Sequence, residues 1–85
     1  MEQTDVSYQI AVGQAIATVR KSRKVSQSLL ALKVKLSTPK LVAIEQGQAA
    51  FNLQNVQKIA TALGIETADL LQIAERMKVQ ILEQE

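Results

Sequence analysis

The segment from Ser26 to Gly47 constrains the fold most, because it carries two sets of helix boundaries within a short span. Ser26 is placed to accept a hydrogen bond from a free amide of a first helical turn, and Gly47 to end a helix in the left-handed conformation. Between them, Pro39 suits the first position of a helix, with Thr38 as its N-cap. The segment therefore predicts two short helices joined by a tight turn at Lys35 and Leu36.

Helical periodicity on both sides of this segment predicts a further helix before it and another after it. The first runs from about Ser7 to Arg20, with Thr4 or Ser7 as its cap. The later one begins after Asn52, its cap, and ends at Gly64. The expected core positions of these helices and of the central pair are Tyr8, Val12, Ala15, Ile16, Val19, Leu30, Ala31, Val34, Leu41, Ile44, Leu53, Val56, Ile59, Ala60 and Leu63.

A fifth helix is predicted over about 68–85, with Thr67 as its cap. Its early apolar residues, Leu70 and Leu71, are expected to join the core. The later ones extend beyond it and form an amphipathic stripe that suits a dimer interface, while the alternative is a helix folded back onto its own domain. The expected dimerisation residues are Met77, Ile81 and Leu82.

The composition agrees with an all-α fold. Hydrophobic residues make up 47% of the 85 residues and aromatic residues only 2%, so the core must be aliphatic. One proline and three glycines leave little room for the turns of an all-β fold. We therefore expect one compact five-helix domain over residues 1–85, with an extended C-terminal helix.

The absence of cysteine and histidine limits the chemistry. Without them the chain has no thiolate or imidazole for a metal site, and no Ser-His or Cys-His pair for catalysis. No glycine-rich phosphate loop is present either. We expect no metal, no cofactor and no enzymatic activity.

Charge is unevenly distributed along the chain. Seven Lys or Arg residues and no Asp or Glu lie between Val6 and Ile44, whereas six of the eight acidic residues lie from Glu45 onward. A one-signed helical surface favours a polyanion such as DNA, although a solvated face is the simpler alternative. No apolar run is long enough to cross a membrane, and the N-terminus is unlike a secretory signal, so a cytoplasmic protein is expected.

Residues 12–71 resemble the lambda-repressor/Cro type of helix-turn-helix domain, also called the xenobiotic-response-element family. The residues that carry the resemblance are Arg20, Ser26, Gln27, Leu30, Ala31, Val34, Leu36, Leu41, Ile44, Glu45, Gly47, Leu53, Ile59, Ala60, Ala62, Leu63, Gly64, Ile65, Asp69, Leu70 and Leu71.

The resemblance implies a sequence-specific DNA-binding transcriptional regulator of bacterial, plasmid or phage type. It implies that the second helix of the pair enters the major groove while the first crosses the DNA backbone, and that a homodimer binds an inverted-repeat operator. Gln27 would brace a base-reading residue. The residues placed at double-stranded DNA by the resemblance are Arg20, Arg23, Ser26, Gln27, Lys35, Ser37, Thr38, Pro39, Lys40, Val42, Ala43 and Asn52.

Three departures from the family pattern modify this expectation. Lys35 stands where the family usually has glycine, which predicts either a strained left-handed residue or an altered turn. Lys40 is the only long hydrogen-bond donor on the expected base-reading surface, so phosphate contacts and DNA shape should carry much of the recognition.

The third departure is apolar. Leu29 and Leu32 occupy positions where the family usually shows polar residues. Either the N-terminal arm or the C-terminal helix covers them, or they contact a second protein chain. The second possibility supports an alternative function, a protein-interaction module such as an antitoxin or anti-repressor with little specific DNA binding.

Overall fold

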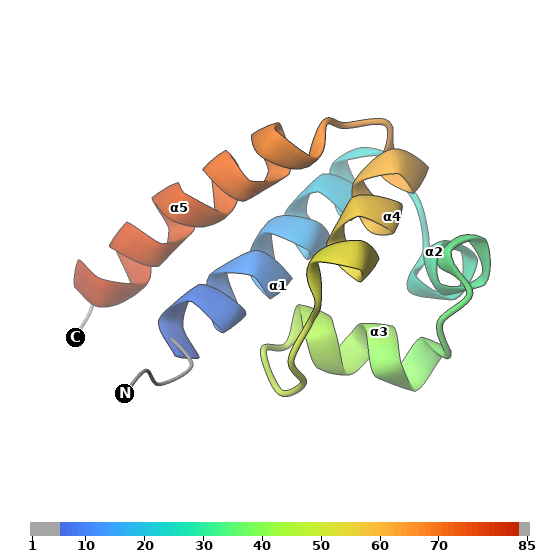
Figure 1. Ribbon diagram of the computed structural model, residues 1–85, viewed down its shortest axis with the longest axis horizontal. Helices are drawn as coiled ribbons and strands as arrows, with labels where there is room; N and C mark the ends of the chain where they lie inside the picture. The colour runs from blue at the N-terminus through green and yellow to red at the C-terminus, as the bar shows by residue number, and fades with distance from the viewer. Residues whose placement is uncertain (1–5, 84–85) are drawn as a thin grey trace.

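A computed structural model describes residues 6–83 of the chain, and these form five α-helices (Figure 1). No strand occurs among the described residues, so the all-α expectation is confirmed. None of these helices is both long and apolar enough to span a membrane. The helices are α1 (Val6–Ser22), α2 (Gln27–Val34), α3 (Thr38–Glu45), α4 (Leu53–Leu63) and α5 (Thr67–Glu83).

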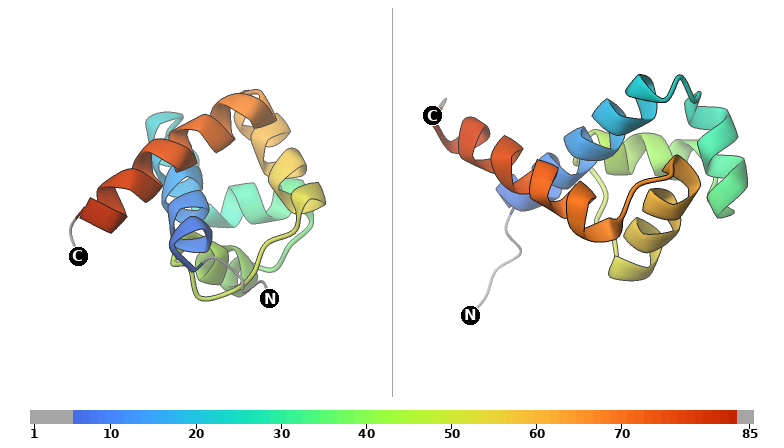
Figure 2. Two further views of the ribbon diagram at one scale, coloured as in Figure 1. Left: turned by 60° about the vertical axis from the view of Figure 1, so that its left-hand side comes forward. Right: turned by 90° about the horizontal axis from the view of Figure 1, so that it is seen from above.

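The helix α1 forms the centre of the arrangement. It packs along α5 on one side and against α3 and α4 on the other, while α2 packs against α3 and α4 (Figures 1 and 2). The helices α1 and α5 run in opposite directions, so the start of α1 and the end of α5 lie at the same end of the molecule (Figure 1). The short helix α2 lies at the other end, and α3 has its exposed residues, Pro39 and Lys40, at its start (Figure 1).

The core is aliphatic, as the composition predicts. Nearly every expected core position is buried or packed against the buried cluster, and Ala11 and Ala74 are added to it. Leu53 is the exception, because its side chain is 58% exposed. Its spacing places it on the buried face of α4, but it is the first residue of the helix and lies beyond the edge of the core.

The start of α3 differs from the sequence expectation by one residue. Ser37, and not Thr38, is the N-cap: its hydroxyl accepts a hydrogen bond from the Lys40 amide at 3.2 Å. Thr38 is the first helical residue and Pro39 the second. Proline is tolerated there because every amide of the first turn lacks an intrahelical partner, so its missing N–H removes no helix hydrogen bond.

The ends of the two long helices also differ from expectation. The helix α1 already includes Ser7 and continues to Ser22, so Ser7 does not cap it, and the alternative cap, Thr4, lies outside the described residues. The helix α5 begins at Thr67, because the Leu70 amide donates to the Glu66 carbonyl at 3.0 Å. It is described to Glu83.

Glycine allows α1 and α3 to approach closely. A Cβ on Gly13 would overlap the Ile44 carbonyl oxygen and lie 2.7 Å from that of Glu45, so no other residue fits without moving a backbone. Gly47 has a φ of +74° and ends α3 in the left-handed conformation, as predicted. Its carbonyl accepts a hydrogen bond from the Gln9 side chain at 2.9 Å, which ties the end of α3 to α1.

Candidate nucleic-acid interface

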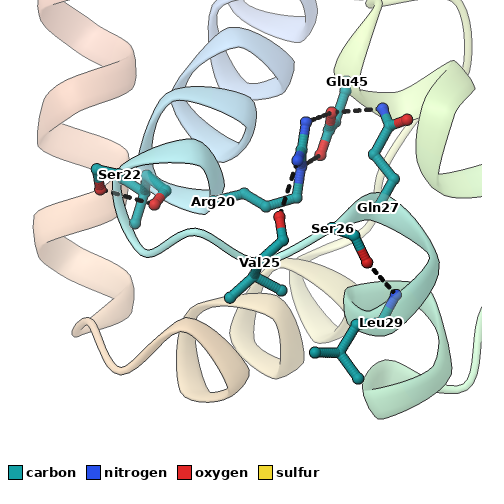
Figure 3. A network of polar contacts seen from close by, with 8 residues as sticks. Arg20, Ser22, Val25, Ser26, Gln27, Leu29 and Glu45 are labelled. Atoms are coloured by element: carbon teal, nitrogen blue, oxygen red, sulfur yellow. Dashed lines mark hydrogen bonds and ion pairs between the residues drawn. The ribbon is translucent and has the colours of Figure 1, made fainter.

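A buried ion pair joins α1 to the end of α3. Arg20 donates from Nε to Glu45 Oε2 at 2.7 Å and from Nη2 to Glu45 Oε1 at 3.0 Å (Figure 3). The third guanidinium nitrogen, Nη1, donates to the Val25 carbonyl at 2.9 Å, and Gln27 Nε2 donates to Glu45 Oε1 at 2.9 Å. One carboxylate thus collects donors from α1 and α2, and it fixes α3 against both.

This network corrects the expectation that Arg20 contacts DNA. The Arg20 residue is only 8% exposed, and all three of its nitrogens already have protein partners. Burying a guanidinium is costly unless it is paired, and Glu45, itself 7% exposed, provides the pairing. Gln27 was expected to brace a base-reading residue, but in the structure its side chain donates to the Glu45 carboxylate.

Burial of Glu45 has an electrostatic consequence for the whole interface. Glu45 is the only acidic residue between positions 6 and 65, and it is neutralised inside the protein. Every exposed charge on this part of the chain is therefore positive, whereas the exposed carboxylates of the described residues lie from Glu66 onward. The exposed cations are Lys21, Arg23, Lys24, Lys33, Lys35, Lys40 and Lys58.

Three helices present capped N-termini. Ser26, Ser37 and Asn52 accept hydrogen bonds from the third helical amides of α2, α3 and α4, at 3.1, 3.2 and 2.7 Å. The caps predicted at Ser26 and Asn52 are confirmed. None of these helices has an acidic residue in its first turn. Their partial positive charge is therefore available to an anion such as phosphate.

The start of α3 carries few side chains that can read bases. Pro39 and Lys40 are exposed, while Thr38, Val42 and Ala43 are half-buried. The cap of α3 was expected from the sequence to be the Thr38 hydroxyl. Because Ser37 is the cap instead, capping does not use the Thr38 hydroxyl. Lys40 is the only residue of the first turn of α3 with a long hydrogen-bond donor, and it is exposed.

The turn between α2 and α3 contains a left-handed residue at Lys35. Of the two possibilities that the sequence offered, a strained left-handed residue or an altered turn, the structure has the first. Lys35 has φ 61° and ψ 41°, which is the left-handed region. The Leu36 amide then donates to the Ala31 carbonyl at 3.0 Å, which completes a helix-ending motif. Lys24, after α1, also has a positive φ, of 59°, and no sequence signal marked it.

The apolar residues singled out in the sequence fall into two groups. Leu29 and Leu32 are 43% and 74% exposed on α2, and α5 does not cover them. The N-terminal arm, the other expected cover, lies outside the described residues. Met77 and Ile81 are half-buried against the domain's own core, so this part of α5 is folded back along α1, whereas Leu82 is 49% exposed.

Sequence reasoning missed the structural role of Glu45, and it did not include the exposed Lys33 and Lys58 among the expected DNA-binding residues. The signal for Glu45 was available, because a single carboxylate within a long basic stretch must meet a cation on folding. Nothing in the sequence indicated that Lys58 of α4 lies near the lysines of α2. Among the described residues, no cluster of three or more acidic side chains could hold a metal ion.

Two short helices, a left-handed turn between them and the flanking helices that bury their inner faces define a helix-turn-helix domain. The sequence matches the helix-turn-helix family over residues 16–71, and the chain belongs to that family, in its lambda-repressor/Cro type. The resemblance inferred from the sequence is thereby confirmed.

Individual proteins of known sequence or structure agree with this assignment. An immunity repressor protein of Bacillus phage phi105 is 37% identical over 62 residues, which cover 73% of this chain and 43% of that protein. The chain thus spans less than half of that relative's length.

Two solved structures are similar in fold. The clp gene regulator ClgR from Corynebacterium glutamicum superposes with a TM-score of 0.84 at 26% identity, covering 91% of this chain and 83% of that one. The restriction-modification controller protein C.AhdI from Aeromonas hydrophila superposes with a TM-score of 0.70 at 34% identity, covering 73% and 94%.

Proposed function

We propose that this protein is a DNA-binding transcriptional regulator that binds a duplex operator with the N-terminal end of α3 in the major groove. The observation that carries the proposal is the neutralised Glu45. Because that carboxylate is buried and paired, every exposed charge of residues 6–65, the segment that contains the capped ends of α2, α3 and α4, is positive. The names of its relatives, a repressor, a gene regulator and a controller protein, support the same function. Such a regulator acts on DNA in the cytoplasm.

The contacts divide into phosphate and base contacts. Lys40, Lys35 and Arg23 are exposed near the capped helix ends and are suited to phosphates, as are the free amides of the first turns. Base reading falls to the N-terminal half of α3, where Lys40 of the first turn can donate to guanine and the Val42 side chain of the second turn can contact a thymine methyl. With so few donors, phosphate contacts and DNA shape contribute most of the affinity.

Two-fold symmetry is the second part of the proposal. A single small module makes few contacts, and a dimer doubles them on an inverted repeat. The exposed apolar residues Leu82 and Val79 of α5 and Val6 of α1 lie toward the end of the molecule where α1 begins and α5 ends. We propose them as the centre of the dimer contact, in place of Met77 and Ile81, which pack inward.

Selection from a pool of randomised duplexes with the purified protein tests the function. The expected result is enrichment of an inverted repeat whose half-sites lie about one helical turn apart, roughly 10 base pairs. Single half-sites without symmetry would contradict the dimer, and no enrichment at low salt would contradict the whole proposal. Sedimentation of Leu82→Glu, with Gln80→Glu as an exposed neighbour on the same helix, tests the dimer contact separately.

A protein-interaction module is the second candidate. The exposed pair Leu29 and Leu32 favours it, because two neighbouring leucines on the outer face of α2 suit a protein contact. The salt dependence of duplex binding separates the two functions. A DNA regulator that contacts many phosphates loses affinity steeply as salt rises, whereas an interaction module binds no duplex even at low salt.

A further inference from the structure

A groove with no acidic lining residue runs between α2 and α4. Its volume is about 590 Å³, and Lys33 and Lys35 line it from α2 and the turn, while Lys58 lines it from α4. Val34 and Ala62 form part of its apolar floor. We call it the lysine groove. It brings Lys58 of α4 together with Lys33 and Lys35, which lie more than 20 residues earlier in the sequence.

The charges of the lysine groove are not compensated by nearby acids. No acidic residue lines it, and the only carboxylate of positions 6–65, Glu45, is buried in its pair with Arg20. Like charges held near one another repel, so an anion is the expected occupant. The long stems of the lysines allow the ammonium groups to reach out of the groove toward an extended ligand.

The lysine groove lies next to the helix N-termini that we propose to contact DNA. Lys35 lies just before Ser37, the cap of α3, and Gln54, another lining residue, lies in the first turn of α4. The groove therefore begins between two helix N-termini that the proposed function places at phosphates. From there it continues along α4 for one turn to Lys58, about 6 Å further.

We propose that the lysine groove binds the phosphodiester backbone of duplex DNA and extends the interface beyond the recognition helix. Lys33, Lys35 and Lys58 neutralise successive phosphates. The side-chain amide of Gln54 donates a hydrogen bond to one of these phosphates. This inference rests on the proposed function, and it explains how a recognition helix with one long donor gains affinity. An acidic protein segment would match the charge as well, but the groove is continuous with the helix ends that face DNA.

The test measures duplex binding of a Lys33→Gln/Lys58→Gln double variant by fluorescence anisotropy across a series of salt concentrations. Both substitutions are on exposed helix surfaces and keep helix-favouring side chains, so the fold should persist, which circular dichroism and thermal unfolding verify. The slope of log K against log salt should fall by about 0.9 for each phosphate that is no longer neutralised, or roughly 2 in total. The decrease in affinity should be similar for specific and unrelated duplexes, because phosphates carry no sequence information.

Arg76→Gln is the matched control, since it removes one exposed charge from α5, away from the groove. It should leave the salt slope unchanged. If the double variant binds with the wild-type slope while wild-type protein binds DNA normally, the groove does not contact DNA and an acidic protein segment becomes its best occupant. If wild-type protein binds no duplex at any salt concentration, the proposed function itself fails. The two failures are therefore distinct.

Discussion

Arg20 and Glu45 lie 25 residues apart in sequence, yet their side chains are joined by hydrogen bonds of 2.7 and 3.0 Å inside the protein. The pair fastens the end of α3 to the end of α1. It also takes the only acidic side chain of residues 6–65 away from the surface that we assign to DNA. One interaction thereby sets both the position of α3 and the electrostatic sign of the interface.

Removing one member of this pair should destabilise the protein strongly. Arg20→Met leaves the Glu45 carboxylate buried without its cation, and we expect a loss of about 3 kcal/mol in the free energy of unfolding. Replacing both, as Arg20→Met/Glu45→Met, leaves no buried charge and should be less destabilising than the single change. Urea denaturation of both variants measures this. A double variant that loses more stability than Arg20→Met alone would show that the residues do not act as a pair.

Gly13→Ala should destabilise although alanine is the better helix former. The substitution alone would favour an α-helix by about 1 kcal/mol. The new Cβ would overlap the Ile44 carbonyl oxygen and lie 2.7 Å from that of Glu45, and both are backbone atoms. Separating α1 from α3 should produce a net loss of about 2 kcal/mol in the free energy of unfolding.

Gly64→Ala provides the contrast, because a Cβ there meets no atom within 4 Å and only its φ of +75° is unfavourable. We expect a loss of about 1 kcal/mol from this dihedral strain. Thermal or urea denaturation compares the two variants. A Gly13→Ala protein as stable as wild type would contradict the close approach of α1 and α3.

Lys35→Gly should make the protein more stable and a weaker DNA binder at once. Glycine relieves the left-handed strain at φ 61° but gives the unfolded chain more freedom, for a net gain of about 0.5–1 kcal/mol. The same change removes an ammonium group from the lysine groove. Lys24→Gly is the matched control, since it has a φ of 59° and lies outside the groove, so its stability gain should come with a smaller decrease in affinity.

Tyr8 should make the fold sensitive to alkaline pH. Burial and, secondarily, the Glu75 carboxylate raise the pKa of its phenol above the ordinary value of 10.0, while Lys78, whose ammonium lies 5.8 Å from the ring centre, opposes the shift. The folded state therefore holds the phenolic proton more tightly than the unfolded chain does. The protonated Tyr8 phenol therefore contributes fully to the free energy of unfolding below pH 10. This contribution is lost as the pH rises through the higher pKa of the folded state.

Two measurements check this behaviour. Tyr8 is the only tyrosine in the chain, so the absorbance of tyrosinate reports this pKa alone. Tyr8→Phe keeps a ring beside Phe51, whose centroid is 6.2 Å away, but has no phenolic proton. Its loss of stability above pH 10 should be shallower than that of the wild-type protein. Equal losses in both proteins would assign the alkaline effect to the lysines instead.

Local signals in the sequence were enough to predict most of the fold. The capping residues Ser26 and Asn52, the helix-ending glycines and the spacing of aliphatic residues depend only on neighbours along the chain, and the structure confirms them. The cap of α3 was misplaced from Ser37 to Thr38, because proline fits either of the first helical positions and therefore marks the helix start only to within a residue.

By itself, the sequence determined the helical class, the helix-turn-helix pair and the uneven distribution of charge, because periodicity, capping and composition are local properties. Only the tertiary structure decided which charges stay at the surface and which side chains meet. It turned Arg20 inward to Glu45, exposed Leu53, folded Met77 onto the core and brought Lys58 beside Lys33 and Lys35. These outcomes depend on contacts between residues distant in sequence, and their free energies arise only once the helices have packed.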